Sequence, residues 1–560
     1  MSDVVTPSLS RRGLLAAGLG SGLALAVAQW PTAYAADAPF VHGVASGDPL
    51  PDGIVLWTRV TPSVDATPGS GVGPATPVSW EVARDEAFTR IVRRGTATTS
   101  SDRDHTLHVD VRGLSPATTY WYRFRALGAT SRVGRTRTAP AAQTDAAIRF
   151  GVVSCANYDW GWFTPYAFLA ARSDLDAVLH LGDYVYEYAP GGVIAGYPEN
   201  PRNADPRHEV TTLADYRQRH GCYKQERHLQ DLHAAHPMIA VWDDHEIAND
   251  TWAEGAENHD PATEGEWATR ATAGRRAFLD WLPIRHTDPD DWLRINRRVA
   301  FGKQVDLFML DERRFRTKAP KSLLLGYGYL GTGSSDPDAT MLGSEQEHWL
   351  VQGMRSSTAR WKVLGNQVPF FPQVLLAQLP GQVTEVLGPR LAELLDTPIA
   401  QLYVEDWNGF LAQRQRLVEG MAGLDNVVIL TGDVHQSFAS EIPRQPNKYL
   451  LDRRSVAVEF VTPGVASPSV QAMVDQVVPG TGRLLDSLLT TNNVLANPWI
   501  KFGEGMRTGC MVVDFDAGRV QTDWFLVDDL TSPASGLSHA ASWQSRRGTD
   551  RLTRASAPLA

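Results

Sequence analysis

The sequence predicts an α/β protein with an N-terminal β-sandwich domain, and three observations support this. Short apolar runs separated by turn residues fill the chain from about Phe40 to Pro140. Beyond that region, strand-like apolar runs alternate with helical stretches, which is typical of an α/β core. The chain has 560 residues, enough for two or more domains, and its 43% hydrophobic and 21% charged residues are ordinary for a globular protein.

The first 35 residues have the pattern of an export signal. A Ser-Arg-Arg motif begins at Ser10, a mildly apolar run extends to Val27, and Ala33-Tyr34-Ala35 follows. This pattern predicts a twin-arginine signal peptide over residues 1–35 and a secreted or cell-wall-associated protein. A membrane anchor would need ~20 strongly apolar residues, whereas several glycines dilute this run. Because twin-arginine export carries folded proteins, the signal also indicates a cofactor acquired before export.

The charge balance argues against a nucleic-acid partner, and the cysteine count argues against a disulfide-stabilised fold. The chain has 53 basic and 63 acidic residues and a formal net charge of −10, so we expect no stable nucleic-acid partner. The three cysteines, Cys155, Cys222 and Cys510, are too few for a disulfide framework, and at least one thiol must be unpaired. In an exported protein such a thiol is expected to be buried or bound to a metal. We expect the protein to be a monomer.

Residues 39–142 are expected to form the β-sandwich domain. Apolar and polar residues alternate in short runs such as 78–82 and 107–111, with turn residues between them. The stretch Leu114–Arg123 resembles part of a fibronectin type III or immunoglobulin-like domain, in which a tyrosine hydroxyl ties down a corner of the sandwich. Tyr120 is therefore predicted to be structural.

Residues 147–530 are expected to form the α/β domain, followed by a polar tail over 531–560. Residues 190–210, rich in Gly, Pro and Asn, are expected to form a surface loop over the site. The predicted strands lie at 148–153, 177–181, 238–242, 305–310, 361–365 and 427–430. The predicted helices lie at 213–232, 267–282 and 344–355.

Five predicted strand ends carry side chains that can bind metals. In chain order these side chains are Cys155, Asp183 with Tyr186, Asp243 with Asp244 and His245, Asn366, and Asp433 with His435. The carboxyl ends of parallel strands meet at one edge of a sheet, so we expect these groups to converge. A thiolate, a phenolate and an imidazole suit ferric iron, whereas carboxylates and an amide suit calcium, magnesium or manganese. The sequence therefore predicts a binuclear metal site that Asp183 could bridge.

Three of these positions have simpler interpretations. Cys155 could be a small buried hydrophobe, although its place after a strand, with acids and a histidine at matching positions, favours ligation. Tyr186 could be a core aromatic, and spacing alone favours it over the two neighbouring tyrosines. Asp243 could be a solvated or helix-capping acid, so Asp244 is preferred as the ligand by register.

The motifs, taken in order, resemble those of PhoD-like alkaline phosphatases and phosphodiesterases, a branch of the metallophosphoesterase superfamily. That superfamily has Gly-Asp-x-x, Gly-Asn-His-Glu and Gly-His-x-His, where this chain has Gly-Asp-Tyr-Val-Tyr from Gly182, Trp-Asp-Asp-His-Glu from Trp242 and Gly-Asp-Val-His from Gly432. The segments Gly43–Pro49 and Leu56–Arg59 resemble the family's sandwich domain. The resemblance implies a metallophosphoesterase α/β sandwich preceded by a fibronectin III/Ig-like β-sandwich domain.

The resemblance also implies how the ligands divide between two metals. Cys155, Tyr186 and His435 would hold Fe(III), and Asp183 would bridge this ion to a Ca(II).

The calcium site would be completed by Asp244, Asn366 and Asp433. His245 would be the catalytic acid or would contact the phosphate beside Asp244. Two arginines, Arg313 and Arg314, are expected either to bind phosphate or to form surface salt bridges.

The function implied is that of a secreted binuclear-metal phosphoesterase. It would hydrolyse phosphodiesters, with phosphomonoesters as a second substrate class, by metal-assisted in-line attack on phosphorus. The alternative is a phospholipase D acting on phosphatidylcholine-type phospholipids, which would contact a membrane surface transiently. Apolar segments at 323–330 and 374–377 could face lipid in that case, or they could be ordinary packing.

Overall fold

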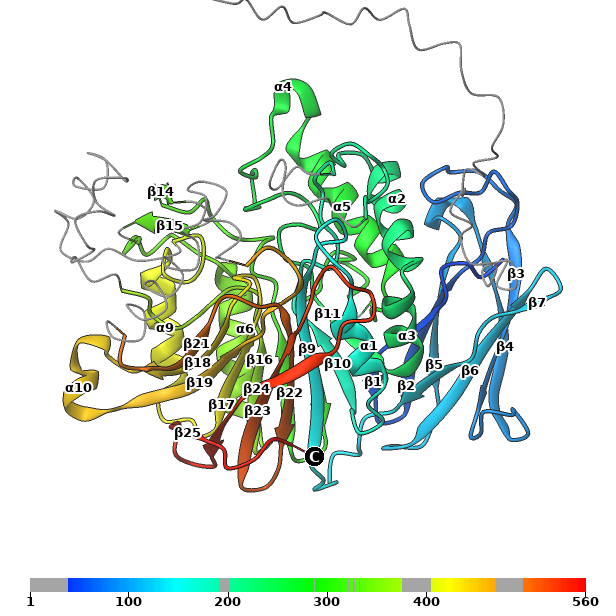
Figure 1. The fold of residues 1–560 in the computed structure, drawn as a ribbon. Coiled ribbons are helices and arrows are strands. Elements are labelled where there is room, and N and C mark those ends of the chain that lie inside the picture. The colour runs from blue at the N-terminus through cyan, green and yellow to red at the C-terminus, as the bar shows by residue number, and fades with distance from the viewer. Residues whose placement is uncertain are drawn as a thin grey trace, which may run out of the picture.

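Two large β-sheets pack face to face, with helices on their outer sides (Figure 1). The structure is a computed structural model, and it describes residues 39–190, 202–286, 288–320, 322–325, 328–331, 333–374, 404–469 and 497–559. The first sheet has the order β25-β24-β23-β22-β9-β10-β11-β1-β2-β5, with β20 paired to β9. The second has the order β12-β13-β16-β17-β19-β18-β21.

The strands of both sheets are short, and most are buried. The first sheet contains β1 (Val44–Leu50), β2 (Gly53–Arg59), β5 (Thr106–Arg112), β9 (Ile148–Ala156), β10 (Ala177–His180), β11 (Pro237–Ala240), β20 (Gly464–Ala466), β22 (Gly509–Phe515), β23 (Arg519–Val527), β24 (Leu537–Arg546) and β25 (Leu552–Arg554). The second contains β12 (Arg297–Phe301), β13 (Val305–Met309), β16 (Trp361–Gly365), β17 (Val427–Thr431), β18 (Ser437–Pro443), β19 (Ser455–Val461) and β21 (Ile500–Glu504). A separate hairpin joins β14 (Ser322–Leu325) to β15 (Gly328–Gly331).

The helices divide between the two outer faces of the sandwich. The first sheet is covered by α1 (Thr164–Ala170), α2 (Leu213–Lys224), α3 (Arg227–Ala235) and α5 (Trp267–Trp281). The second sheet is covered by α6 (Gly343–Ser356) and α9 (Leu411–Met421). The short helices α4 (Pro261–Glu264) and α10 (Tyr449–Asp452) lie apart from these layers.

The core between the sheets is apolar and aromatic. Phe150 on β9 meets Phe301 on β12 edge-on, with ring centroids 5.0 Å apart. Near the other side of the sandwich, Phe460 on β19 meets Trp524 on β23 at 5.9 Å. Burial of these large side chains supplies the main driving force for bringing the sheets together. It also fixes the carboxyl ends of β9, β10 and β17 relative to one another.

The predicted N-terminal sandwich is confirmed, but one of its two sheets is continuous with the first large sheet. Its outer sheet contains β3 (Thr76–Ala83), β4 (Ile91–Thr99), β6 (Thr119–Ala126), β7 (Ala129–Thr130) and β8 (Gly134–Arg137). Its inner sheet is β1-β2-β5, and β1 pairs in parallel with β11. The predicted structural role of Tyr120 is also confirmed, because its hydroxyl accepts a hydrogen bond from the Ser115 amide at 2.9 Å.

Two expectations about secondary structure are wrong. Residues 531–560 do not form a tail, because β24 pairs along its length with β23 and β25 adds a further strand. This segment is largely polar because one of its faces is exposed, which weakens its hydrophobic pattern. The helix predicted over 213–232 is two helices, and the Glu226 side chain caps the second by accepting from the Leu229 amide at 2.8 Å.

Several sequence predictions concern residues outside the described ranges. They are the export signal over 1–35, residues 191–201 of the loop predicted over the site, residues 326–327 of the first apolar segment considered for lipid contact, and residues 375–377 of the second. Within the described ranges, no helix combines the length and apolarity needed to cross a bilayer.

Buried histidines predict that the fold loses stability in acid. Burial, together with the charge of Lys224, lowers the pKa of His180 and of His220 to about 3. An unfolded histidine titrates near pH ~6.5, so between these values the unfolded chain binds more protons than the folded chain. The free energy of unfolding should therefore fall as pH drops from about 6.5 toward 4, by up to about 1.4 kcal/mol per pH unit for each histidine.

The variant His220→Phe tests this directly by denaturant unfolding at several pH values. Phenylalanine can keep the ring contacts that His220 makes with Tyr184 and Trp281, but it cannot titrate. Its stability should depend less steeply on pH than that of the wild type. If the free energy of unfolding changed with pH equally in the variant and the wild type, His220 would not contribute to the loss of stability in acid.

Candidate metal centre

The predicted ligands from both sheets meet at the carboxyl ends of their strands. Cys155 is the penultimate residue of β9, and Asp183 follows β10, which pairs with β9 in parallel. Asp433 and His435 follow β17 of the second sheet. The site therefore lies where the edges of the two packed sheets meet, as the strand-end pattern predicts.

Four of these residues have a left-handed backbone. The φ angles are 56° at Cys155, 55° at Asp183, 66° at Asp433 and 54° at His435. Non-glycine residues rarely adopt this conformation, and its occurrence at several neighbouring positions is typical of a functional site. At Gly182, with φ of 106°, an added Cβ would lie 2.3 Å from the Asp243 Cβ, so this turn requires glycine.

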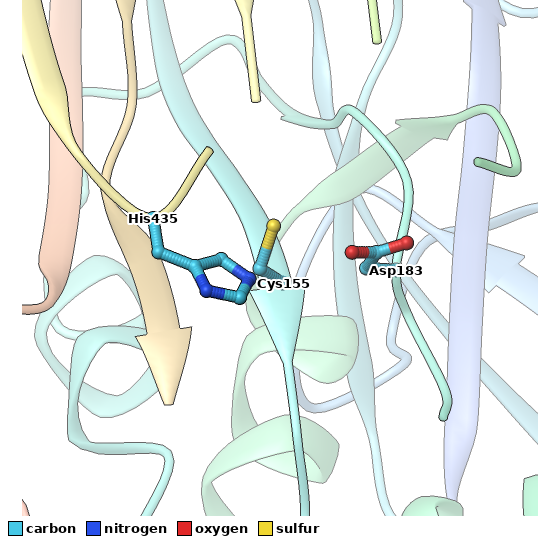
Figure 2. A group of neighbouring side chains, drawn as sticks. All are labelled: Cys155, Asp183 and His435. Atoms are coloured by element: carbon cyan, nitrogen blue, oxygen red, sulfur yellow. The ribbon is translucent and has the colours of Figure 1, made fainter. Parts of the chain in front are cut away.

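Cys155, Asp183 and His435 form the first candidate group of ligands (Figure 2). Their ligand atoms all lie within 4.8 Å of one another. Tyr186 belongs to the same group, because its hydroxyl lies 3.0 Å from Asp183 Oδ2 and 3.3 Å from His435 Nε2. The hydroxyl of Tyr184 instead lies 2.8 Å from His233 Nε2. The structure thus brings together the thiol, carboxylate, phenol and imidazole that the sequence predicts for iron.

The environment of His435 favours a neutral imidazole with a free Nε2. Its Nδ1 lies 3.1 Å from the carbonyl of Pro468, and a carbonyl can only accept, so Nδ1 carries the proton. Burial, with a further effect from His245, lowers the pKa of His435 to about 4. A hydrogen bond of this kind to one ring nitrogen commonly orients the other toward a metal.

Two further groups contain carboxylates. One comprises Asp183, Asp244 and His245, and the other comprises Asp243, Asp244 and Asp433. Asp183 is common to the first of these and to the group with Cys155, which is the arrangement required of a bridging ligand. The structure thus places Asp244 beside Asp183 in one group and beside Asp433 in the other.

Arg313 lies inside the carboxylate cluster. Its guanidinium donates to Asp243 and lies 3.5 Å from Asp244 Oδ1 and 3.4 Å from Asp433 Oδ1. Asp243 is therefore neither solvated nor a helix cap, because it is fully buried in an ion pair. Arg313 is not a surface residue either, whereas Arg314 forms the expected peripheral salt bridge, to Asp291 at 2.6 Å.

Asn366 follows β16, beside β17, and is fully buried. Its Nδ2 donates to the Val368 carbonyl and to Thr431 Oγ1. Among the described residues, its Oδ1 accepts one long hydrogen bond, 3.4 Å, from Trp407 Nε1. The two hydrogen bonds that Nδ2 donates therefore orient the amide group, and Oδ1 is the atom that could bind a cation.

The buried negative charge of the site fits bound cations. Within the described residues, Asp183 Oδ1, Asp243 Oδ2 and Asp244 Oδ1 are buried and have no hydrogen-bond partner. Burial raises the pKa of Asp183 and of Cys155 well above their ordinary values, and neighbouring carboxylates add to the shift. Such groups are costly unless a cation compensates them. Hard oxygen donors beside a thiol, a phenol and an imidazole match the two kinds of metal predicted.

Two buried glutamates that were not predicted from the sequence organise the site. Glu246 accepts hydrogen bonds from the amides of Asp183 (3.2 Å), Tyr184 and Asp243 (2.7 Å), so it joins two ligand loops. Glu187 accepts from His245 Nδ1 at 2.8 Å and from the Asn249 amide at 2.7 Å. Glu187 directly follows Tyr186, and Glu246 directly follows His245. This position within the motifs is the feature of the sequence that could have indicated their role.

The carboxylates around His245 favour its protonated form. Although burial opposes the charged form, the carboxylates of Glu187, Asp244 and Asp183 raise the pKa of His245 well above its ordinary value. The ring also stacks on Tyr186, with centroids 4.2 Å apart. Because Nδ1 donates to Glu187, Nε2 is the nitrogen available to a ligand or substrate.

The two packed sheets with outer helices and a site of metal-ligand type at the strand ends define a metallophosphoesterase-like α/β domain, here preceded by a fibronectin type III-like sandwich. Residues 150–524 match the model of the PhoD-like phosphatase family, and residues 24–140 match the model of its N-terminal domain. The chain therefore belongs to the PhoD-like phosphatase family.

Individual relatives agree with this assignment. The chain is 33% identical over 541 residues to alkaline phosphatase D of Bacillus subtilis (strain 168), covering 94% of this chain and 85% of the relative. Among solved structures, PhoD superposes with a TM-score of 0.79 at 30% identity, covering 93% of each chain.

The hydrogen bonds of Glu246 predict that it is needed to hold the ligand loops. In Glu246→Gln an amide NH₂ would face backbone N–H donors, so at least one hydrogen bond would be lost in a buried place. The free energy of unfolding should fall by about 1–3 kcal/mol, and the metal content of the purified protein should decrease. Denaturant unfolding and elemental analysis measure these effects.

Glu254→Gln is the matched control, because Glu254 is exposed in the same region of the chain. This variant should keep the wild-type free energy of unfolding and the wild-type metal content. If Glu246→Gln kept wild-type stability and metal content, the proposed clamp between the two loops would be refuted.

Proposed function

We propose that the protein is an exported phosphodiesterase that also accepts phosphomonoesters and uses Fe(III) and Ca(II). The observation that carries this proposal is the sharing of Asp183 between the group with Cys155 and His435 and the group with Asp244. Membership of the PhoD-like phosphatase family supports a phosphate ester as substrate. The chemical difference between the two groups supports two unlike cations.

The proposed ligands follow the predicted division. Cys155, Tyr186 and His435 would hold iron, and Asp183 would bridge. Asp244, Asn366 and Asp433 would hold calcium. Bound cations would neutralise the nonbridging phosphoryl oxygens and activate water for in-line attack.

The chain's own residues would orient the reactants and move the proton. Arg313 supplies a fixed positive charge beside Asp244 and Asp433, which limits repulsion of an anionic ester by these acids. His245, with its Nδ1 bonded to Glu187, would donate the Nε2 proton to the departing alcohol. Glu187 is therefore proposed as a positioning residue and His245 as the catalytic acid.

Hydrolysis of bis(p-nitrophenyl) phosphate tests the proposed activity. Protein supplied with iron and calcium should release p-nitrophenol, and removal of both metals by chelation should abolish release. Restoring both metals should recover more activity than either one alone, because the two groups of ligands differ in kind. Absence of product with both metals bound would refute the diesterase proposal.

The ligand assignment has its own spectroscopic readout. A tyrosinate bound to Fe(III) should give a visible charge-transfer band, which Tyr186→Phe should remove. Tyr188→Phe, a neighbouring tyrosine outside the proposed ligand set, should keep the band. Unchanged colour and iron content in Tyr186→Phe would refute the proposed iron site.

The contact between Glu187 and His245 predicts an effect that depends on the leaving group. A p-nitrophenolate departs without protonation, whereas an alkyl alcohol needs an acid. Glu187→Gln should therefore slow hydrolysis of glycerophosphocholine by about tenfold or more and slow bis(p-nitrophenyl) phosphate much less. Rates (kcat) for the two substrates provide the comparison.

Glu209→Gln is the control for nearby charge, because Glu209 contacts Arg270 and Asn258 but lies outside the hydrogen bonds of His245. It should affect both substrates equally and weakly. Equal slowing of both substrates in Glu187→Gln would contradict a role in protonating the leaving group.

Export remains part of this proposal. Its support is the twin-arginine pattern at Arg11 and Arg12, followed by an apolar run and Ala33-Tyr34-Ala35. Replacing both arginines by lysine should retain the protein inside the cell if this route is used.

A further inference from the structure

Two adjacent leucines stand out on the surface away from the metal site. Leu450 is 64% exposed and Leu451 is 87% exposed, both on the short helix α10. Single exposed apolar residues are common, but the other large exposed hydrophobic residues in the described ranges are separated from one another in sequence. This pair therefore calls for a specific explanation.

Basic side chains surround the two leucines. We call residues 444–454 the α10 tip, which comprises the 3₁₀ turn Pro446–Lys448, helix α10 and their flanks. The exposed charged residues of the α10 tip are Arg444, Lys448, Asp452, Arg453 and Arg454. Four positive charges and one negative charge thus lie in eleven residues, although the whole chain has a net charge of −10.

The α10 tip is firmly attached to the second sheet. Tyr449 is fully buried, its hydroxyl donates to Glu441 at the end of β18, and Lys501 Nζ lies 2.9 Å from that hydroxyl. Arg551 donates to the Arg453 carbonyl at 2.7 Å and pairs with Glu441 at 3.1 Å. The leucines are therefore held outward on a fixed support.

The α10 tip lies at the opposite end of the strands from the metal centre. β18 begins two residues after His435 and continues for seven residues before the α10 tip follows. Seven residues of strand extend about 23 Å. Figure 1 shows α10 projecting at the edge of the second sheet, beyond β18 and β19. Changes at the α10 tip should therefore leave the chemistry of the site unaffected.

We infer that the α10 tip docks the protein on a bilayer that contains anionic lipid. Exposed leucines insert among acyl chains, and basic residues beside them pair with anionic headgroups. The charge of the α10 tip is complementary to such a surface, whereas the chain as a whole has a net charge of −10. Docking at this end would leave the metal centre facing away from the bilayer, so the contact anchors the enzyme and does not deliver lipid to the site.

Co-sedimentation of the full chain with vesicles tests this inference. The wild type should bind vesicles of equal parts phosphatidylcholine and phosphatidylglycerol, bind pure phosphatidylcholine weakly, and dissociate as salt is added. The double variant Leu450→Ser/Leu451→Ser should lower the bound fraction about fivefold or more. Arg444→Gln/Lys448→Gln/Arg454→Gln should lower it comparably.

The matched control is Leu127→Ser, because Leu127 is 59% exposed in the N-terminal sandwich, far from the α10 tip. It should bind vesicles like the wild type, and all variants should hydrolyse a soluble diester at the wild-type rate.

Three outcomes would overturn the inference. The first is failure of the wild type to bind anionic vesicles. The second is loss of binding with the basic residues but not with the leucines, which would indicate a site for a soluble polyanion. The third is self-association that the leucine change removes in the absence of vesicle binding, which would assign the α10 tip to contact between copies of this chain.

Discussion

A concentration of buried negative charge controls the architecture of the site. Asp183, Asp243, Asp244 and Asp433 lie together with the Cys155 thiol where the two sheets meet. Buried charges of one sign are unfavourable unless cations neutralise them. Arg313 neutralises part of this negative charge. We propose that metal ions neutralise the rest, at the buried carboxylate oxygens that lack a hydrogen-bond partner.

The repulsion between these buried carboxylates also explains why the loops at the strand ends are held by many hydrogen bonds. Three buried glutamates each accept backbone amides from loops at the strand ends. Glu246 holds the loops of Asp183 and Asp243, Glu312 holds the amides of Gln367 and Val368 after Asn366, and Glu459 holds those of Phe370 and Phe371. Without such bonds, mutually repelling carboxylates in left-handed turns would separate. These hydrogen bonds therefore hold the loops of the proposed ligands in place, as a selective metal site requires.

The N-terminal sandwich contributes to this rigidity in a way that a separate domain would not. Its inner sheet continues the large sheet through the parallel pairing of β1 with β11, and β11 leads directly into Asp243 and Asp244. At the opposite edge, β22 to β25 extend the sheet beside β9, which carries Cys155. The central strands that carry the candidate ligands are therefore flanked on both sides by other strands and are not sheet edges.

The sequence by itself determined the fold class, the strands that precede the ligand loops and the candidate ligands. These features depend on local patterns, because an apolar strand followed by polar residues is visible within about ten positions. Only the tertiary structure decided that Arg313 lies among the acids, that Glu187 contacts His245, and that β24 belongs to the sheet. Arg313 and Asp243 are 70 positions apart, and Glu187 and His245 are 58 apart. Such pairings depend on how the two sheets pack and leave no periodic signal in the chain.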